Sequence, residues 1–177
     1  MTRVARIFLG GTLVLSFAGP TLAQESKSAA VAKQLSAALD EAKLSSIAVK
    51  DASQPDVFIA ALYYPGSMLL VVQAKMATGG AALAQKIAKK DFQEAYVDLQ
   101  SASDHETKFF VQDNGADGLK MKSFDTVDTH DKSVTYDGDW KKAKAASEQA
   151  YQKSFDDADA QYTKMLTALI AALKKTS

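Results

Sequence analysis

The strongest constraint in this sequence is residues 58–75, FIAALYYPGSMLLVVQAK, the densest hydrophobic stretch beyond the N-terminal region. Pro65-Gly66 divides the stretch, because proline presets φ and glycine accepts the positive φ that many tight turns require. Each half is too short for an ordinary helix, and neither half alternates between apolar and polar residues. Strands that are apolar on both faces are covered on both faces. The stretch therefore predicts a central hairpin that is wrapped by helices or closed into a barrel.

The end of the hairpin changes character. Gln73 and Lys75 share one face of the second strand, and Val72 and Ala74 share the other. The face that carries Gln73 and Lys75 is therefore expected to leave the core.

Helical periodicity is found on both sides of the hairpin. Val31, Leu35 and Leu39 predict an amphipathic helix within residues 28–46. Leu83 and Ile87 predict a middle helix within residues 81–92. A long C-terminal helix is predicted to follow, with Asp139 as its N-cap. Its apolar stripe comprises Tyr151, Phe155, Ala158, Tyr162, Leu166, Leu169 and Leu173.

Further strands are predicted from short apolar runs between turn residues. They cover residues 46–51, 94–103, 107–115, 119–124 and 133–138, with a polar loop over 123–132. The fold class is therefore α+β: a small antiparallel β-sheet or split barrel, flanked by an N-terminal helix, a middle helix and a long C-terminal helix.

The first 23 residues have the layout of a cleaved secretory signal peptide. Arg3 and Arg6 supply the positive region, residues 7–17 the apolar run, and Ala23 ends a small-residue cleavage site. The alternative is a retained membrane anchor, although the apolar run is shorter than a bilayer span of roughly 20 residues. We expect a periplasmic or secreted bacterial protein with a single domain over residues 24–177, 154 residues after cleavage of 23 from 177.

Composition excludes several classes of site. The chain has no cysteine, which excludes disulfides, thiolate metal sites and lipid attachment at an N-terminal cysteine, so no stable membrane anchor is expected after cleavage. Removal of two arginines leaves 21 − 2 = 19 basic residues against 21 acidic ones, a net charge near −2. Nucleic acid is not an expected partner, because the chain has no basic excess to neutralise phosphates.

No catalytic set is recognised in the sequence. His105 and His130 lie in predicted polar loops, and Ser67 lacks the G-x-S-x-G context of a hydrolase nucleophile. In DNGADG, residues 113–118, Asp113 and Asp117 match two positions of a calcium loop, but Phe124 stands where a bidentate glutamate is needed. A simple turn between strands is the alternative for this segment.

A ligand pocket is a second hypothesis for the polar ends of the predicted strands. Gln73, Lys75, Tyr96 and Asp98 lie at the edges of neighbouring predicted strands and could converge there. The alternative is that these side chains are solvated strand ends. For the C-terminal helix, packing on the sheet or on a partner chain is favoured over membrane binding, because its polar face is acidic.

The order of these elements resembles a known family. A helix, a strand, the hairpin VFIAALYYPGSMLLVVQAK, the helix LAQKIAKKDF and the strands AYVDLQ and KFFVQDNGADGL are similar to the pyridoxamine 5′-phosphate oxidase-like split barrel over residues 44–122. The resemblance implies a small barrel, often with FMN at a dimer interface. It also implies a phosphate-binding element at the strand-to-helix junction, QAKMATGGAAL, in which Lys75 is the only basic residue.

The sequence thus predicts an exported α+β binding or interaction protein with no identifiable catalytic set, and a non-enzyme rather than an enzyme. A homodimer, a small ligand or another protein are the partners considered. The residues themselves predict no cofactor. The alternatives are a flavin-binding split-barrel oxidoreductase-like protein with Gln73, Lys75, Tyr96 and Asp98 at its site, and a calcium-stabilised module using Asp113 and Asp117.

Overall fold

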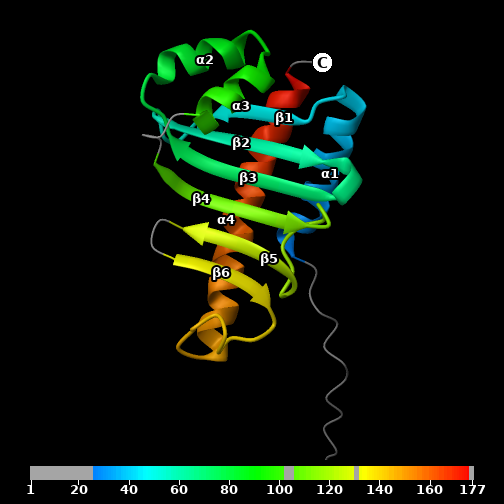
Figure 1. Cartoon of the computed structure of the whole chain (residues 1–177), viewed down its shortest axis with the longest axis vertical. Coiled ribbons are helices and arrows are strands. Elements are labelled where there is room, and N and C mark those ends of the chain that lie inside the picture. Colours follow the sequence, from blue (N-terminus) through cyan, green and yellow to red (C-terminus); the bar gives the residue numbers. More distant parts are fainter. Residues whose placement is uncertain (1–25, 102–105, 130–131, 176–177) are drawn as a thin grey trace, which may run out of the picture.

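The chain combines one antiparallel sheet with helices on both of its faces (Figure 1). A computed structural model describes residues 26–101, 106–129 and 132–175. Its elements are α1 (Lys27–Ala42), β1 (Ser46–Lys50), β2 (Val57–Tyr64), β3 (Leu69–Met76), α2 (Gly80–Ala88), α3 (Phe92–Ser101), β4 (Thr107–Asn114), β5 (Lys122–Thr129), β6 (Lys132–Asp137) and α4 (Glu148–Lys174). The predicted α+β class is confirmed.

In the described part of the chain, six strands form an open sheet in the order of the sequence, each antiparallel to the next. Ala61 of β2 pairs with Val72 of β3, so the predicted central hairpin is confirmed. Its turn is a short 3-10 segment, Pro65–Ser67, and the positive φ falls on Met68 (48°) rather than on Gly66.

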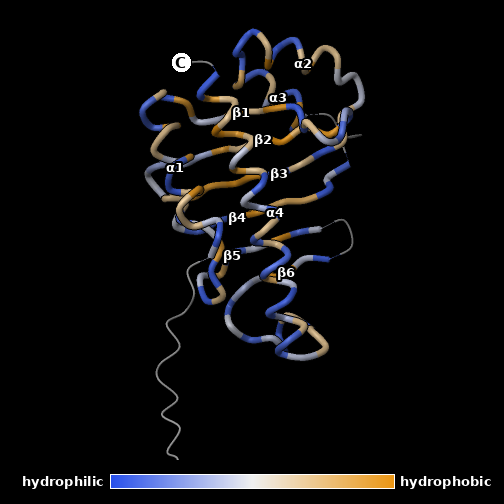
Figure 2. The backbone as a smooth tube through the Cα atoms, turned by 180° about the vertical axis from the view of Figure 1, so that it is seen from behind, coloured by the Kyte–Doolittle hydropathy of each residue, from blue (hydrophilic) through white to orange (hydrophobic). Residues whose placement is uncertain are grey.

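One face of the sheet, called the helix side below, is covered by α4 and α1. The long α4 runs behind the strands, and α1 lies alongside it (Figures 1 and 2). The predicted apolar stripe of α4 is buried throughout and packs on inward-facing residues such as Ile59, Val72 and Val111. Asp159 of α4 accepts hydrogen bonds from the backbone N–H groups of Lys27 (2.7 Å) and Ser28 (3.1 Å) at the start of α1. A carboxylate at a helix N-terminus satisfies free N–H groups and complements the helix dipole.

The predicted start of α4 was wrong. Asp139 accepts N–H bonds from Lys141 and Lys142 within a turn, and the chain then takes a positive φ at Lys144. The N-cap is Ser147, whose hydroxyl accepts a hydrogen bond from the N–H of Ala150 at 3.1 Å.

The opposite face, called the open side below, is covered by α2 and α3 over β1 and β2. A second apolar cluster forms there around Phe58, Ala60 and Leu83. The prediction of a strand over residues 94–103 was wrong, because 92–101 form α3. Ala95 and Leu99 are four residues apart and lie on the buried side of this helix, whereas Val97 is 48% exposed.

The predicted strand 119–124 and polar loop 123–132 were also misplaced. Residues 122–129 form β5, which pairs with β4 on one side and β6 on the other. The polar residues that suggested a loop alternate with Val127, as expected for a strand with one wetted face. The predicted signal peptide lies outside the described residues. Among the described helices, none is both long enough and apolar enough to cross a membrane.

The turn after β4 packs tightly on α1. Gly118 has a φ of +89°, and a Cβ atom there would lie 2.4 Å from the Cα of Ala29. The adjacent N–H of Leu119 donates to the hydroxyl of Ser28 at 3.0 Å. Only glycine suits this position, since the backbone of α1 occupies the space a side chain would need.

We expect Gly118→Ala to lower the free energy of unfolding by about 3 kcal/mol or more, because strain adds to displacement of α1. Gly66→Ala is the matched control: no atom lies within 4 Å of the added Cβ, so its effect should stay within about 0.5 kcal/mol. Urea unfolding of both variants measures the difference. Equal losses would show that the contact between Gly118 and α1 is unimportant.

Candidate functional site

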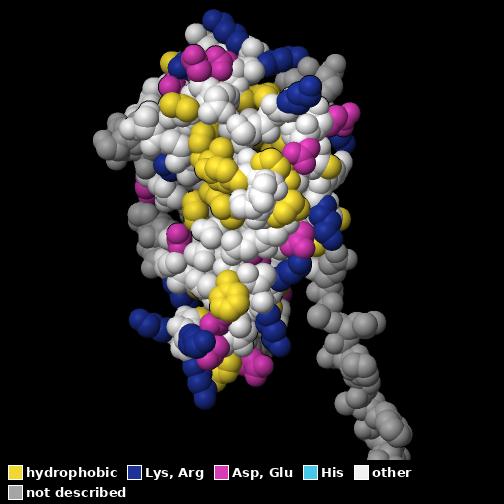
Figure 3. Space-filling view, turned by 45° about the vertical axis from the view of Figure 1, so that its right-hand side comes forward, with side chains coloured by type: hydrophobic (Ala, Val, Ile, Leu, Met, Phe, Trp, Pro, Cys, Tyr) yellow, Lys and Arg dark blue, Asp and Glu magenta, His cyan; other side chains and the backbone are white. Residues whose placement is uncertain are grey.

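An apolar patch lies on the open side, where α2 and α3 do not reach. We define it by Leu62, Tyr64, Leu69, Val71 and Phe110, which share that face of β2, β3 and β4 by register. Tyr64 is 46% exposed, and the other four are half-buried. Figure 3 shows hydrophobic side chains gathered across the middle of the molecule, with charged groups mostly toward its two ends. Exposed apolar side chains that adjoin one another indicate a binding surface more than scattered ones do.

Two of the four residues of the sequence-predicted pocket lie beside this patch. Gln73 and Lys75 share the open side of β3, but this side does not leave the core there, because their neighbours Ala60 and Phe58 are fully buried. Gln73 is only 4% exposed, and the ammonium of Lys75 is 3.5 Å from the carbonyl oxygen of Leu99 in α3. Burial lowers the pKa of Lys75, because a charged ammonium loses hydration under the helix.

The other half of the predicted pocket was wrongly placed on a strand. Tyr96 and Asp98 belong to α3. Tyr96 packs against the cluster under α3, and burial, followed by the nearby Tyr64, raises its pKa to about 12. Asp98 forms an ion pair with Lys86 of α2 at 2.6 Å, and Lys86 also pairs with Glu94 at 3.2 Å. The structure therefore brings Lys75 to α3, the helix that carries Tyr96, whereas Asp98 joins α3 to α2.

Asp113 and Asp117 lie in the turn after β4 and are used as hydrogen-bond acceptors and ion-pair partners. Asp113 is fully buried and accepts from the N–H of Asp117 (3.2 Å), the N–H of Gly118 (2.9 Å) and the hydroxyl of Tyr162 (3.0 Å). Asp117 pairs with Lys120. Within the described ranges, no group of three or more His, Cys, Asp or Glu side chains is placed to hold a metal ion.

A second buried carboxylate in this region was missed by sequence reasoning. Asp125 of β5 is fully buried and accepts from the N–H groups of Asn114 (2.9 Å) and Lys120 (2.8 Å). Asp125 contributes to raising the pKa of Asp113, which reaches about 6 chiefly through burial. An aspartate in a polar run carries no signal that it will point inward, so tertiary pairing alone reveals it.

The strand-to-helix junction offers limited chemistry for a flavin phosphate. The nearest basic group by sequence, Lys75, already donates to Leu99 from the open side of β3. Phosphate sites usually combine several charged and backbone donors. The apolar patch is better suited to bind an apolar surface of a partner than to bind a phosphate group. His105 and His130 lie outside the described residues.

Comparisons of the chain with protein-family models, curated proteins and solved structures found no match.

The buried Asp113 predicts a pH effect on stability. Its pKa in the folded protein, about 6, lies above the ordinary value of 3.8. Protonation therefore favours the folded state: this contribution is complete below pH 4 and is lost as the pH rises through 6. The difference corresponds to about 3 kcal/mol.

Asp113→Asn stays neutral at every pH. As the pH rises from 4 to 7, we therefore expect its free energy of unfolding to increase by about 3 kcal/mol relative to that of the unsubstituted chain. Asp156→Asn, at an exposed position of α4, serves as the control and should follow the unsubstituted chain. Urea unfolding at several pH values measures both. A constant difference between Asp113→Asn and the unsubstituted chain would contradict the assignment.

Proposed function

We propose that this protein is an exported binding module without a catalytic set of its own, and that the apolar patch of Leu62, Tyr64, Leu69, Val71 and Phe110 is its interaction surface. The single observation that carries the proposal is the unequal covering of the sheet. Two helices cover the helix side, whereas α2 and α3 cover the open side over β1 and β2 and leave the patch exposed. Export is supported by the N-terminal sequence, with Arg3, Arg6 and the small-residue site ending at Ala23.

The occupant we propose for the patch is a second copy of the chain. An apolar patch is complementary to itself, which a two-fold interface requires. A two-fold axis parallel to the strands would place α2 and α3 of each copy over the uncovered strands of the other. The mature chain has a net charge near −2, so repulsion between copies is small.

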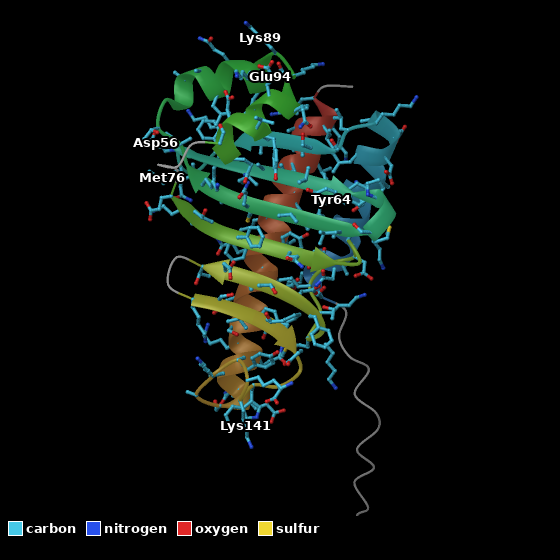
Figure 4. All side chains as sticks on the ribbon, in the orientation of Figure 1. Asp56, Tyr64, Met76, Lys89, Glu94 and Lys141 are labelled. Carbon is cyan, nitrogen blue, oxygen red and sulfur yellow. The ribbon has the colours of Figure 1, made fainter. Side chains whose placement is uncertain are left out.

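Two polar residues next to the patch suit a buried interface, although Asp128, which pairs with Phe110 across β4 and β5, is acidic. Gln112 and Thr126 on β4 and β5 are uncharged, and the hydroxyls of Thr126 and Thr135 lie 3.1 Å apart. Uncharged groups that already have a partner lose less on removal from water than charged groups do. Tyr64 is an aromatic anchor of the kind enriched at interfaces, and Figure 4 shows it at the end of β2.

Light scattering of the mature chain should therefore report a dimer. Val71→Glu places two carboxylates near the two-fold axis and should raise the dimer dissociation constant by at least about 100-fold. Ala30→Glu, an equal change at an exposed position of α1 on the helix side, should leave the dimer intact.

Tyr64→Ser, at the more exposed position, provides a second patch variant if Val71→Glu does not fold. A monomeric unsubstituted chain, or a dimer that survives both patch variants, would reject the second copy as the occupant. In the first case, a different apolar protein surface becomes the alternative occupant.

The flavin alternative makes a separate prediction. If the chain binds FMN, titration should quench flavin fluorescence, and Lys75→Met should abolish the quenching. Lys108→Met, at a β4 lysine that pairs with Glu106, should not. The binding-module proposal expects no quenching with any of these chains. Saturable quenching that depends on Lys75 would favour the flavin-binding protein.

A further inference from the structure

A groove on the helix side lies apart from the apolar patch, on the other face of the sheet. It has a volume of about 240 Å³ and runs between α4 and strands β4 to β6. Phe109, Val134 and Tyr136 form its floor, and Ala158 and Gln161 of α4 form one wall. In Figure 1, α4 passes behind β5 and β6 at this level. The floor is apolar, while the rim carries hydroxyl and amide groups from Thr129, Ser154 and Gln161 and two charged groups of opposite sign, Lys132 and Asp157.

The groove has a local cause in the sequence of α4. Ala158 is the smallest side chain in the buried stripe of this helix and stands between Phe155 and Tyr162. Large side chains on either side hold the helix away from the sheet, and an alanine at this turn leaves the intervening space unfilled. Protein interiors ordinarily fill such space, because lost contacts weaken packing.

The aromatic floor is held in place by its neighbours. The Tyr136 ring meets Phe155 edge-on, with centroids 5.1 Å apart and planes at 88°, and lies 5.5 Å from the ring of Tyr151. The phenol oxygen of Tyr136 is 3.4 Å from the hydroxyl of Ser154. A ring fixed from two sides cannot swing in to close the groove, so the space is preformed.

We propose that this groove binds a small aromatic molecule of one or two rings that carries a hydrogen-bonding group at its edge. Phe109 and Tyr136 offer ring faces and edges for aromatic contact, and the rim offers partners for the polar edge. An apolar cavity of about 150 Å³ holds a benzene ring, so 240 Å³ suits a ring system about as large as indole. The site does not depend on the patch, and its test is independent of the dimer.

Indole is the probe, added to the isotope-labelled mature chain and followed by amide chemical shifts. We expect saturable shifts confined to β4–β6 and to α4 around Ala158, with a dissociation constant on the order of 0.1–1 mM for so small a ligand. Ala158→Leu fills the groove and should weaken binding at least about tenfold. Ala171→Leu, the same change at an exposed position of α4, should bind indole as the unsubstituted chain does.

Gln161→Trp is a second variant that covers the rim from an exposed position, for use if Ala158→Leu does not fold. Loss of the indole shifts in either folded variant supports the site. Unchanged affinity in the folded groove variants, no saturable shifts in the unsubstituted chain, or shifts centred on Leu62 and Val71 would each overturn it. The patch variant Val71→Glu should bind indole normally, so failure of the dimer and failure of the groove are distinguishable.

Discussion

The packing of α4 across the sheet is the constraint on which the other contacts depend. This helix buries the inward faces of the strands, and its Asp159 accepts hydrogen bonds from the first N–H groups of α1. One turn further on, Tyr162 donates to Asp113 and fixes the turn whose Gly118 touches the same end of α1. The N-terminal helix, the β4 turn and the C-terminal helix are thus held at one point. Loss of α4 would remove the Asp159 acceptor from the start of α1 and the Tyr162 donor from the β4 turn.

This arrangement makes the two faces of the sheet unequal. On the helix side, α4 and α1 cover the sheet and leave one groove beside Ala158 and another between the two helices, whereas on the open side only α2 and α3 cover the strands. Together α2 and α3 hold 19 residues, 9 + 10, so they cannot cover six strands. Exposed apolar side chains are unfavourable in water, and a partner that covers them recovers the lost free energy. Unequal covering is therefore the physical basis of the proposed apolar patch, whereas the groove on the helix side has its own local cause at Ala158 of α4.

Sequence patterns were informative where one local signal dominated. The stripe of α4 was predicted because it repeats a helical spacing over many residues, and the hairpin because Pro65-Gly66 divides a continuous apolar run. Residues 94–103 were misread because Ala95 and Leu99 satisfy a strand period of two and a helical spacing of four alike. Gln73 and Lys75 do share one strand face, but that face is buried at Gln73, whose neighbour Ala60 belongs to the second apolar cluster; Tyr96 and Asp98 shared the error in their segment.

By itself the sequence determined the class of the protein: an α+β chain with a hairpin at its centre, a long C-terminal helix, no cysteine and nearly balanced charge. Composition, helical periodicity and the Pro65-Gly66 turn suffice for this, because each of these signals is present in the local sequence. Tertiary structure alone decided that Leu62 and Val71 stay half-exposed and that Asp113 and Asp125 turn inward. Both outcomes depend on which parts of the sheet are covered by segments distant in the sequence, and no local sequence pattern specifies this covering.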